Sequence, residues 1–417
     1  MILCVVNPVQ TEESLDAVAE KYVRLVLAVG EHDSDYVDAF YGPTAWKEQV
    51  RKQNLSLADI HKSADLLIRE IDAGKLPDEE MIQLRRRYLQ KQLEALRAFV
   101  AIRLGHQMQF DDESKALYDA VAQHHSEEHF AETLEQLNKE LPGSQPINDR
   151  YEAFREGFVI PSDKVDSVFR LALEECRKRT RQYITLPSDE SFAIEYVKDK
   201  PWSGYNWYQG NFKSLIQVNI DLPIYIDRAL DLAGHEGYPG HHVYNVLLEK
   251  SLQRDLGWKE FSIYPLYSPQ SLIAEGSANY GVEILFNPEE RIQFEKNVLF
   301  PAAGLPPEKV EQYYKISHIV RQLSFSGNEA ARRYLNGEWN KEKTVEWLIK
   351  YGLYTEQRAA QRVQFIEKYR SYVINYNLGQ EMVKNYIESR AQTTEEKWRE
   401  LAKLLGSPRL LSQQEPP

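Results

Sequence analysis

The stretch AGHEGYPGHHVYN, from Ala233 to Asn245, joins a His-Glu pair to a break in a helix. In zinc-binding helices of the pattern His-Glu-x-x-His, two histidines one turn apart face the same metal ion. Here Pro239 stands where the second histidine would be. Proline removes an amide donor and clashes with the carbonyl four residues earlier, so the helix must bulge or end at this point.

Two histidines follow the break, His241 and His242. On an undisturbed helix, positions 235 and 241 lie about 600° apart, whereas positions 235 and 242 share a face but lie roughly 10 Å apart along the axis. Gly240 gives the backbone the freedom for a tight turn that brings His241 round. We therefore expect His235 and His241 to bind a metal, with His242 as the alternative second ligand. A Pro-Gly turn that merely carries surface histidines is the other interpretation.

A zinc site in a hydrolase needs a third protein ligand and one open position. The segment SLIAEGSANYGVEILF, from Ser271 to Phe286, carries Glu275 and Glu283 on about the same face of a predicted helix, among small and apolar residues. Because a buried carboxylate must be paired or bind a metal, we expect Glu275 to be the third ligand of one zinc ion per chain. Glu283 would then orient a ligating histidine or be an ordinary exposed residue.

Glu236 directly follows the first predicted ligand, so on a helix it projects beside the metal. There it can act as the general base that takes a proton from the attacking water. Two imidazoles and a carboxylate also suit non-haem iron, but a glutamate in this position is what hydrolysis needs. The pattern therefore favours zinc.

Helical periodicity dominates the rest of the chain, beginning with the apolar stripe of the segment Asp78–Leu104. The same pattern predicts helices at 113–141, 163–183, 307–335, 341–351 and 356–390. Short β-branched and aromatic runs between Ser191 and Pro223 predict a small antiparallel sheet instead. The expected fold class is mainly α, in the α+β sense, with this sheet beside the histidine stretch.

The Pro-, Gly- and Ser-rich segment LPGSQPIND, residues 141–149, is the best candidate for a domain boundary. It predicts an N-terminal helical region at 1–145, either separate or part of one continuous domain. A catalytic region would follow at 146–405, and a flexible tail at 406–417.

The composition of the chain limits the kinds of binding partner that we expect. The net charge of −12 argues against nucleic acid or a membrane surface as the main partner, because both need clustered Lys and Arg. The two cysteines, Cys4 and Cys176, form no disulfide framework. The N-terminal sequence MILCVVNPVQ lacks a basic segment and a long apolar run, and no stretch approaches the roughly 20 apolar residues of a membrane span. These features indicate a cytoplasmic protein.

Three stretches resemble a bacterial family known as domain of unknown function family 885. They are HEGYPGHH (235–242), AEGSANYGVE (274–283) and INYNLGQEMV (374–383). The resemblance implies a large helical metallopeptidase fold of the zincin type with a glutamate ligand. It assigns His235, His241 and Glu275 as zinc ligands and Glu236 as the base.

The same resemblance points to Tyr376 and Tyr280 as residues that line the site, where a phenol could donate a hydrogen bond to an oxyanion. This chain departs from the family's Asp-Thr-Gly-x-His segment, because Phe325 and Glu329 stand at the Asp and His positions. His318 is the candidate replacement for the missing histidine.

The leading hypothesis is therefore a zinc-dependent peptidase that acts on short peptides, as a carboxypeptidase or oligopeptidase. Substrate would lie along an edge strand within YNWYQGNFKSLIQVN (205–219). Arg321, Arg370 and Lys213 are candidates to meet a substrate carboxylate. The alternatives are a metal-dependent amidase for a non-peptide amide, and a catalytically silent helical binding protein with a vestigial metal site.

Overall fold

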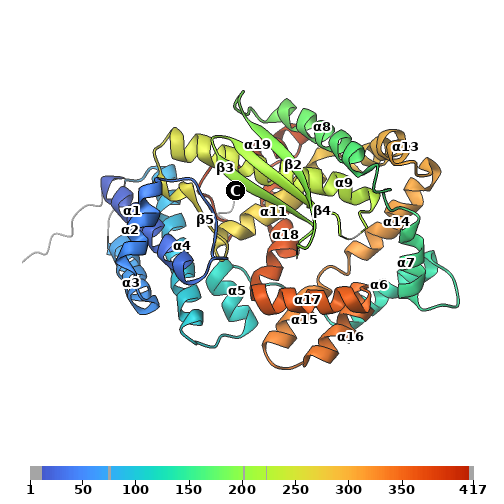
Figure 1. Ribbon diagram of the computed structural model, residues 1–417, viewed down its shortest axis with the longest axis horizontal. Coiled ribbons are helices and arrows are strands. Elements are labelled where there is room, and N and C mark those ends of the chain that lie inside the picture. The colour runs from blue at the N-terminus through green and yellow to red at the C-terminus, as the bar shows by residue number, and fades with distance from the viewer. Residues whose placement is uncertain (1–11, 74–76, 201, 222, 413–417) are drawn as a thin grey trace, which may run out of the picture.

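The computed structural model describes residues 12–73, 77–200, 202–221 and 223–412 and is mainly helical (Figure 1). The α-helices are α1 (Glu12–His32), α2 (Thr44–Gln53), α3 (Leu57–Ala73), α4 (Glu80–Arg103), α5 (Phe110–Tyr118), α6 (Glu127–Glu140), α7 (Ile147–Glu156), α8 (Val165–Tyr183), α9 (Ile226–Leu232), α10 (His241–Leu247), α11 (Pro269–Leu285), α12 (Pro288–Phe294), α13 (Phe300–Ala303), α14 (Val310–Arg321), α15 (Ser326–Leu335), α16 (Lys341–Gly352), α17 (Glu356–Tyr369), α18 (Ile374–Glu388) and α19 (Thr394–Leu405).

The strands are β1 (Val37–Phe40), β2 (Ser191–Val197), β3 (Gly204–Gly210), β4 (Lys213–Asn219) and β5 (Ile263–Pro265). Short π-helices are η1 (Ala233–Gly237), η2 (Leu248–Arg254) and η4 (Glu295–Leu299), and short 3₁₀-helices are η3 (Lys259–Ser262), η5 (Pro307–Lys309) and η6 (Arg370–Val373). The expected fold class, mainly α with a small sheet, is confirmed.

The sheet beside the histidine stretch is mixed rather than purely antiparallel. Its strand order is β2-β4-β3, with β3 antiparallel and β2 parallel to β4. β4 folds back from β3 as a hairpin and inserts between β3 and β2, which run in opposite directions. A strand in that position must be parallel to one neighbour. The insertion leaves β3 as a free edge of the sheet.

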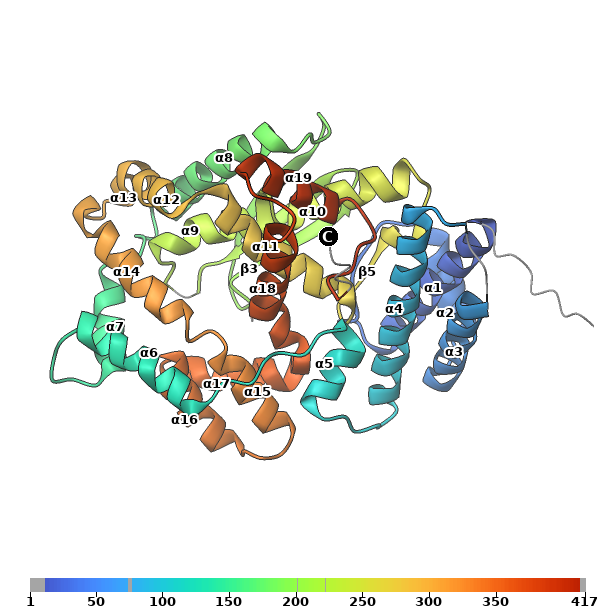
Figure 2. The ribbon, with the colours of Figure 1, turned by 180° about the vertical axis from the view of Figure 1, so that it is seen from behind.

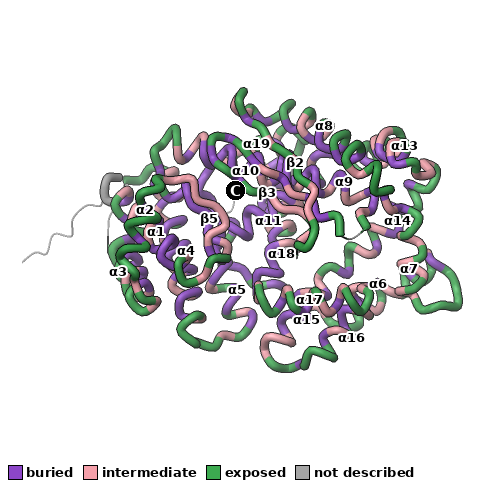
Figure 3. Tube along the Cα trace, viewed as in Figure 1, coloured by how far each residue is buried: buried purple, intermediate pink, exposed green. Residues whose placement is uncertain are grey.

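The predicted N-terminal region does not have a core of its own. One buried apolar cluster contains Leu15 and Val100 together with Ile216, Leu272 and Leu405, so it runs through both predicted regions. A second cluster packs α6 against α14 to α17, at the lower right of Figure 1. The purple interior in Figure 3 accordingly continues across the molecule. The helices before residue 145 thus pack as part of one continuous body.

The first residues of the predicted tail pack against the body of the protein. Leu410 and Leu411 are buried in the main core, and Arg409 forms an ion pair with Glu80 of α4. Seen from behind in Figure 2, α19 lies over α10 and α11, and the chain continues from it. Residues 413–417 of that tail, and Cys4 near the N-terminus, lie outside the described residues.

α11 and α18 form the most extensive contact between two elements of the described chain. The backbones cross closely at Gly276 and Gly379, because a Cβ atom on Gly276 would lie 2.3 Å from the carbonyl oxygen of Gly379. This crossing places Glu275 of α11 beside the tyrosines around the start of α18. Among the described residues, none of the helices combines the length and the apolar composition needed to cross a bilayer.

Candidate metal centre

The histidine stretch folds as the proline predicts. α9 continues into η1, the chain leaves the helix at Tyr238, and α10 begins at His241. The amide of Gly240 donates to the carbonyl of Gly234 over 2.9 Å. A Cβ atom on Gly240 would lie 1.8 Å from the carbonyl oxygen of His235, so only glycine fits at this turn. The turn reverses the chain and brings His241 back to His235.

The two histidines and Glu275 converge. The Nε2 atoms of His235 and His241 are 3.1 Å apart, and the rings are nearly perpendicular, at 88°. Glu275 places Oε2 3.3 Å from the Nε2 of His235 and Oε1 3.8 Å from that of His241. The side chains are only 15%, 13% and 9% exposed in that order, so these are not surface histidines.

This donor set fits zinc. With Zn–N bonds of about 2.0–2.1 Å and a tetrahedral angle, two ligating nitrogens lie roughly 3.3 Å apart. The 3.1 Å separation of the His235 and His241 nitrogens is close to that value. The Oε2 atom of Glu275 is buried and accepts no hydrogen bond. A buried carboxylate oxygen without a donor is unfavourable, and a cation between it and the two imidazoles would satisfy it.

Glu236 also reaches this cluster. His235, Glu236 and His241 each offer one atom that could bind a metal, and these three atoms lie within 4.8 Å of one another. Of the two carboxylates, Glu275 is the better candidate for a metal ligand, because the hydroxyl of Tyr372 donates to its Oε1 atom over 2.8 Å and fixes that carboxylate. Glu236 has no such anchor among the described residues, which leaves its carboxylate free to accept a proton.

The environment of Glu236 suits a general base. Burial raises the pKa of Glu236 to about 7, with Glu275 adding to the effect and His235 and Arg228 opposing it. A base whose pKa lies near neutrality can both accept and return a proton. Its carboxylate approaches Gly204 of β3, where a Cβ atom would lie 2.9 Å from Oε1.

The pKa values of the other members of the cluster reflect their mutual contacts. Burial opposes the charged form of both His235 and Glu275, but their contact raises the pKa of the histidine and lowers that of the carboxylate. Burial, and then the neighbouring His235, lower the pKa of His241 to about 4. A neutral His241 offers the lone pair that a metal requires.

His235 is held in one orientation by Asn279, a residue that the sequence interpretation missed. Its Nδ1 lies 2.9 Å from Oδ1 of Asn279, whose Nδ2 donates to the carbonyl of Tyr376 over 2.9 Å. The amide oxygen must accept from the imidazole, so the lone pair of the histidine is on Nε2, facing the cluster. Asn279 follows Glu275 by four residues, and this helical spacing could have identified it.

The two predicted site tyrosines separate in the structure. Tyr376 lines the main cavity, and its phenol stays protonated because burial and the charge of Glu275 raise its pKa. Tyr280 does not line the cavity; its hydroxyl points to Glu388 at 3.5 Å. The structure therefore does not bring Tyr280 to the cavity beside Tyr376, since its hydroxyl faces Glu388 at the end of α18. Tyr372, which the sequence interpretation missed, takes the place beside Glu275.

His242, the alternative ligand, points away from the cluster. It is fully buried, and its ring nitrogens contact Oγ of Ser214 at 2.8 Å and Oε2 of Glu190 at 2.9 Å. Glu190 also accepts hydrogen bonds from Tyr238 and Arg177. Both ring nitrogens of His242 thus have hydrogen-bond partners, and these contacts hold the start of α10 on the side away from the cluster.

Other sequence-predicted residues do not join the cluster of His235, His241 and Glu275. Glu283 is exposed and binds Gln380 and Lys384, so it orients no histidine. Glu329 is buried against Arg332, away from the cavity. His318 is exposed and does not line the cavity, so it does not replace the family histidine.

The cluster opens into a cavity of about 1400 Å³. Side chains from α9, β3, η1, α10, α11, α14, α17 and α18 line it, including His235, Glu236, His241, Glu275 and Tyr376. Its volume exceeds that of a typical small-molecule pocket. The cavity is therefore large enough to admit a short peptide beside the cluster.

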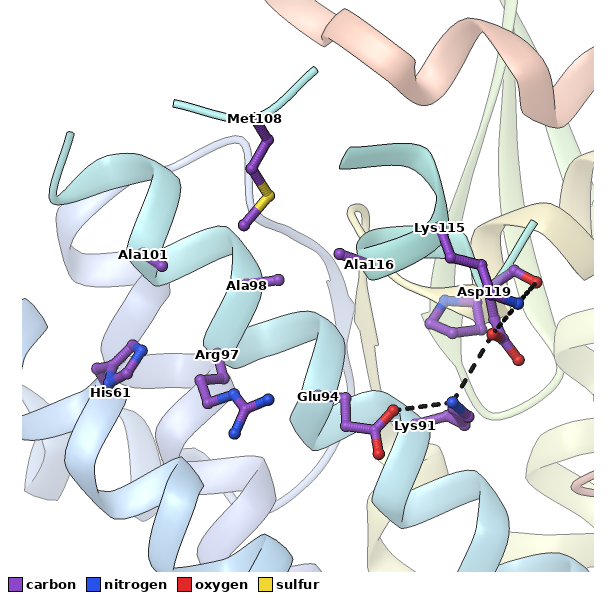
Figure 4. Close-up of a pocket in the computed structure, with 11 residues that line it drawn as sticks. His61, Lys91, Glu94, Arg97, Ala98, Ala101, Met108, Lys115, Ala116 and Asp119 are labelled. Atoms are coloured by element: carbon purple, nitrogen blue, oxygen red, sulfur yellow. Dashed lines mark hydrogen bonds and ion pairs between the residues drawn. The ribbon is translucent and has the colours of Figure 1, made fainter. Parts of the chain in front are cut away.

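A second cavity, of about 360 Å³, lies between α4 and α5 (Figure 4). Its cations are paired with carboxylates: Lys91 with Glu94 at 2.9 Å and Lys115 with Asp119 at 2.7 Å. In Figure 4 dashed lines join these lysines to their carboxylate partners. This cavity contains none of the predicted site residues.

No family model matches the chain, and no curated protein matches it. The solved structures that are similar to this chain include two proteins. One is described as a "putative lipoprotein" from Colwellia psychrerythraea, with a TM-score of 0.51 at 14% identity, covering 97% of this chain and 76% of that one. The other, described as a "putative lipoprotein of unknown function" from Shewanella oneidensis, has a TM-score of 0.45 at 12% identity and covers 90% and 81%. The first similarity indicates a shared fold alone.

Proposed function

We propose that this protein is a zinc-dependent peptidase related to domain of unknown function family 885. The observation that carries the proposal is the convergence of His235, His241 and Glu275 in one buried cluster, with Glu236 beside it. Two imidazole nitrogens, one carboxylate and an adjacent carboxylate of raised pKa are what metal-assisted hydrolysis needs. His235, His241 and Glu275 would hold the metal.

Zinc in such a site lowers the pKa of water and polarises a carbonyl group. In the proposed reaction, the carboxylate of Glu236 accepts a proton from the attacking water and delivers it to the amine that leaves. The phenol of Tyr376 donates a hydrogen bond to the substrate oxygen as it gains negative charge. Tyr372 and Asn279 keep Glu275 and His235 in place through the bonds described above.

The free edge of β3 supports a peptide as the substrate. The amide of Asn219 donates to the carbonyl of Ser203 over 2.9 Å, and antiparallel pairs alternate in their hydrogen bonding. Tyr205 and Trp207 thus direct their backbone groups to β4, whereas Gly204 and Asn206 direct theirs to the free edge. An extended peptide could pair there, next to Glu236.

Metal content and hydrolysis test the proposal together. Protein purified without added metal should contain about one zinc per chain, and His235→Ala and His241→Ala should lose it. A library of short peptides should be cleaved by the wild-type protein but not by Glu236→Gln, which keeps its metal. A wild-type protein that binds no zinc, even when zinc is supplied, would refute the proposal.

The same experiment addresses the two alternatives. Zinc binding with hydrolysis of a non-peptide amide alone would favour an amidase, since the residues around the metal serve both reactions. Zinc binding without any hydrolysis would favour a silent binding protein. We further propose a cytoplasmic location, which fractionation of cells that express the protein would test.

A further inference from the structure

The main cavity is lined by arginines that have no carboxylate partner. Arg358 and Arg362 lie one turn apart on α17 and both face the cavity, which Arg321 of α14 also lines. None of the three forms an ion pair within the described parts of the chain, and Nε of Arg362 is buried without a hydrogen-bond partner. A buried donor on a charged group is unfavourable while it is unpaired, so this arrangement favours an anion in the cavity.

Several other charged residues of the cavity are already paired. Asp231 contacts Arg291 at 2.7 Å, and Glu283 contacts Lys384 at 3.0 Å. Glu381 also lines the cavity, but it forms no ion pair with the arginines of α17. The chain as a whole has a net charge of −12, so carboxylates are abundant enough to neutralise surface cations. The unpaired arginines on α17 are therefore a local feature of the cavity.

A chain of aromatic contacts connects these arginines to the proposed metal ligands. The guanidinium of Arg362 lies 4.7 Å from the ring centre of Phe365, which is 6.5 Å from that of Tyr376. The ring of Tyr376 is 5.8 Å from that of Tyr372, which bonds to Glu275. Burial and Glu275 raise the pKa of Tyr376 whereas Arg362 opposes this, so the phenol lies within reach of both charges.

We propose that Arg358 and Arg362 form a subsite for a carboxylate of the peptide substrate. The planar guanidinium matches the two oxygens of a carboxylate, and the stacked Phe365 ring limits how Arg362 can turn. The proposal rests on the proposed function, and it narrows the substrates to peptides with a carboxylate a short distance from the cleaved bond. That carboxylate is either the free C-terminus or an Asp or Glu side chain.

Peptide binding to the full chain, measured without catalysis, tests the subsite. In a Glu236→Gln background, fluorescence anisotropy would compare labelled tetra-alanine as the free acid, the same peptide as its C-terminal amide, and an amide with Glu at the third position. We expect Arg362→Gln and Arg358→Gln each to weaken binding of a carboxylate-bearing peptide by about 10- to 100-fold, because hydrogen bonds to charged groups contribute roughly that much. Binding of the neutral amide should not change.

Arg69→Gln is the matched control, because Arg69 is exposed on α3, pairs with Asp65 and does not line the cavity. It removes the same charge and should leave all three affinities unchanged. Selectivity for the free acid identifies the C-terminus as the ligand, and selectivity for the Glu peptide identifies a side chain. Equal affinity for all three peptides, or selectivity that persists in both arginine variants, would overturn the subsite. Carboxylate-selective binding by a protein that holds no zinc would uphold the subsite and refute the peptidase.

Discussion

Nδ1 of His235 and Oδ1 of Asn279 lie 2.9 Å apart, and Nδ2 of Asn279 donates a hydrogen bond to the backbone carbonyl of Tyr376. The asparagine therefore cannot turn its nitrogen toward the imidazole without losing the bond to α18. This contact fixes both the tautomer and the ring plane of His235. It also connects the candidate metal site to the crossing of α11 and α18.

Replacement of Asn279 by alanine should weaken zinc binding. Loss of such an orienting partner typically reduces metal affinity by about 10- to 100-fold, because the imidazole is then free to rotate and to change tautomer. Competition with a chromophoric chelator would measure the change. Asn377→Ala is the control, since Asn377 lines the cavity and bonds to Asn328 without contact to the histidines. Equal zinc affinity in the wild-type protein and Asn279→Ala would contradict this role.

His241 and His242 should respond differently to replacement by alanine. His241→Ala should lose zinc with little loss of fold. His242→Ala should keep zinc, but its free energy of unfolding should fall by roughly 1–3 kcal/mol, because Glu190 and Ser214 lose a buried partner. Metal analysis and urea unfolding of both variants separate the two roles. Zinc lost only in His242→Ala would return that residue to the ligand set.

Glu190 should make stability depend on pH in the acid range. Burial opposes its charge, but hydrogen bonds from His242, Tyr238, Arg181 and Arg177 outweigh this and lower its pKa well below the ordinary value. A lowered folded-state pKa contributes stability above the unfolded pKa of about 4.3, and this contribution is lost as the pH falls below that value.

Glu190→Gln should therefore lower the free energy of unfolding by roughly 1–3 kcal/mol at pH 7, and the difference from wild type should shrink below about pH 4. Urea unfolding at pH 7, 5 and 3.5 would follow it. Glu195→Gln, at an exposed position of β2, should change stability by less than about 0.5 kcal/mol throughout. A difference for Glu190→Gln that grows toward low pH would contradict the assignment.

Much of the fold could be predicted from the sequence where local pattern decides it. The expected helices at 78–104, 163–183 and 341–351 correspond to α4, α8 and α16 within two residues at each end. The expected helices at 113–141 and 356–390 are each divided. Asp119 and Arg370 adopt positive φ, at 55° and 52°, where the helices end. Neither residue type signals such a turn in the way that glycine does, so the apolar pattern overestimated the length of both helices.

The candidate site also combines contacts that local sequence predicts with contacts that it does not. His235, Glu236 and His241 lie within seven residues of one another, and short-range helix geometry with a break at Pro239 was enough to bring them together. Tyr372 and Glu275 are 97 residues apart in the chain, and their contact depends instead on how α11 crosses α18 at Gly276 and Gly379. Spacing within one helix contains no information on that crossing. The distinction between Tyr376 and Tyr280 was missed for the same reason.

Tyr376 and Tyr280 provide the last prediction, because the resemblance assigns them one role and the structure separates them. Tyr376→Phe should lower kcat by about 10²- to 10³-fold with little change in KM, since the lost donor acts on charge that develops only during the reaction. Tyr280→Phe should leave both constants unchanged, because its hydroxyl faces Glu388 outside the cavity. Steady-state kinetics on a cleaved peptide would measure both variants at equal zinc content. Full activity in Tyr376→Phe would assign oxyanion stabilisation to another group, and Tyr372, the next phenol along the same wall, would be replaced by phenylalanine to test it.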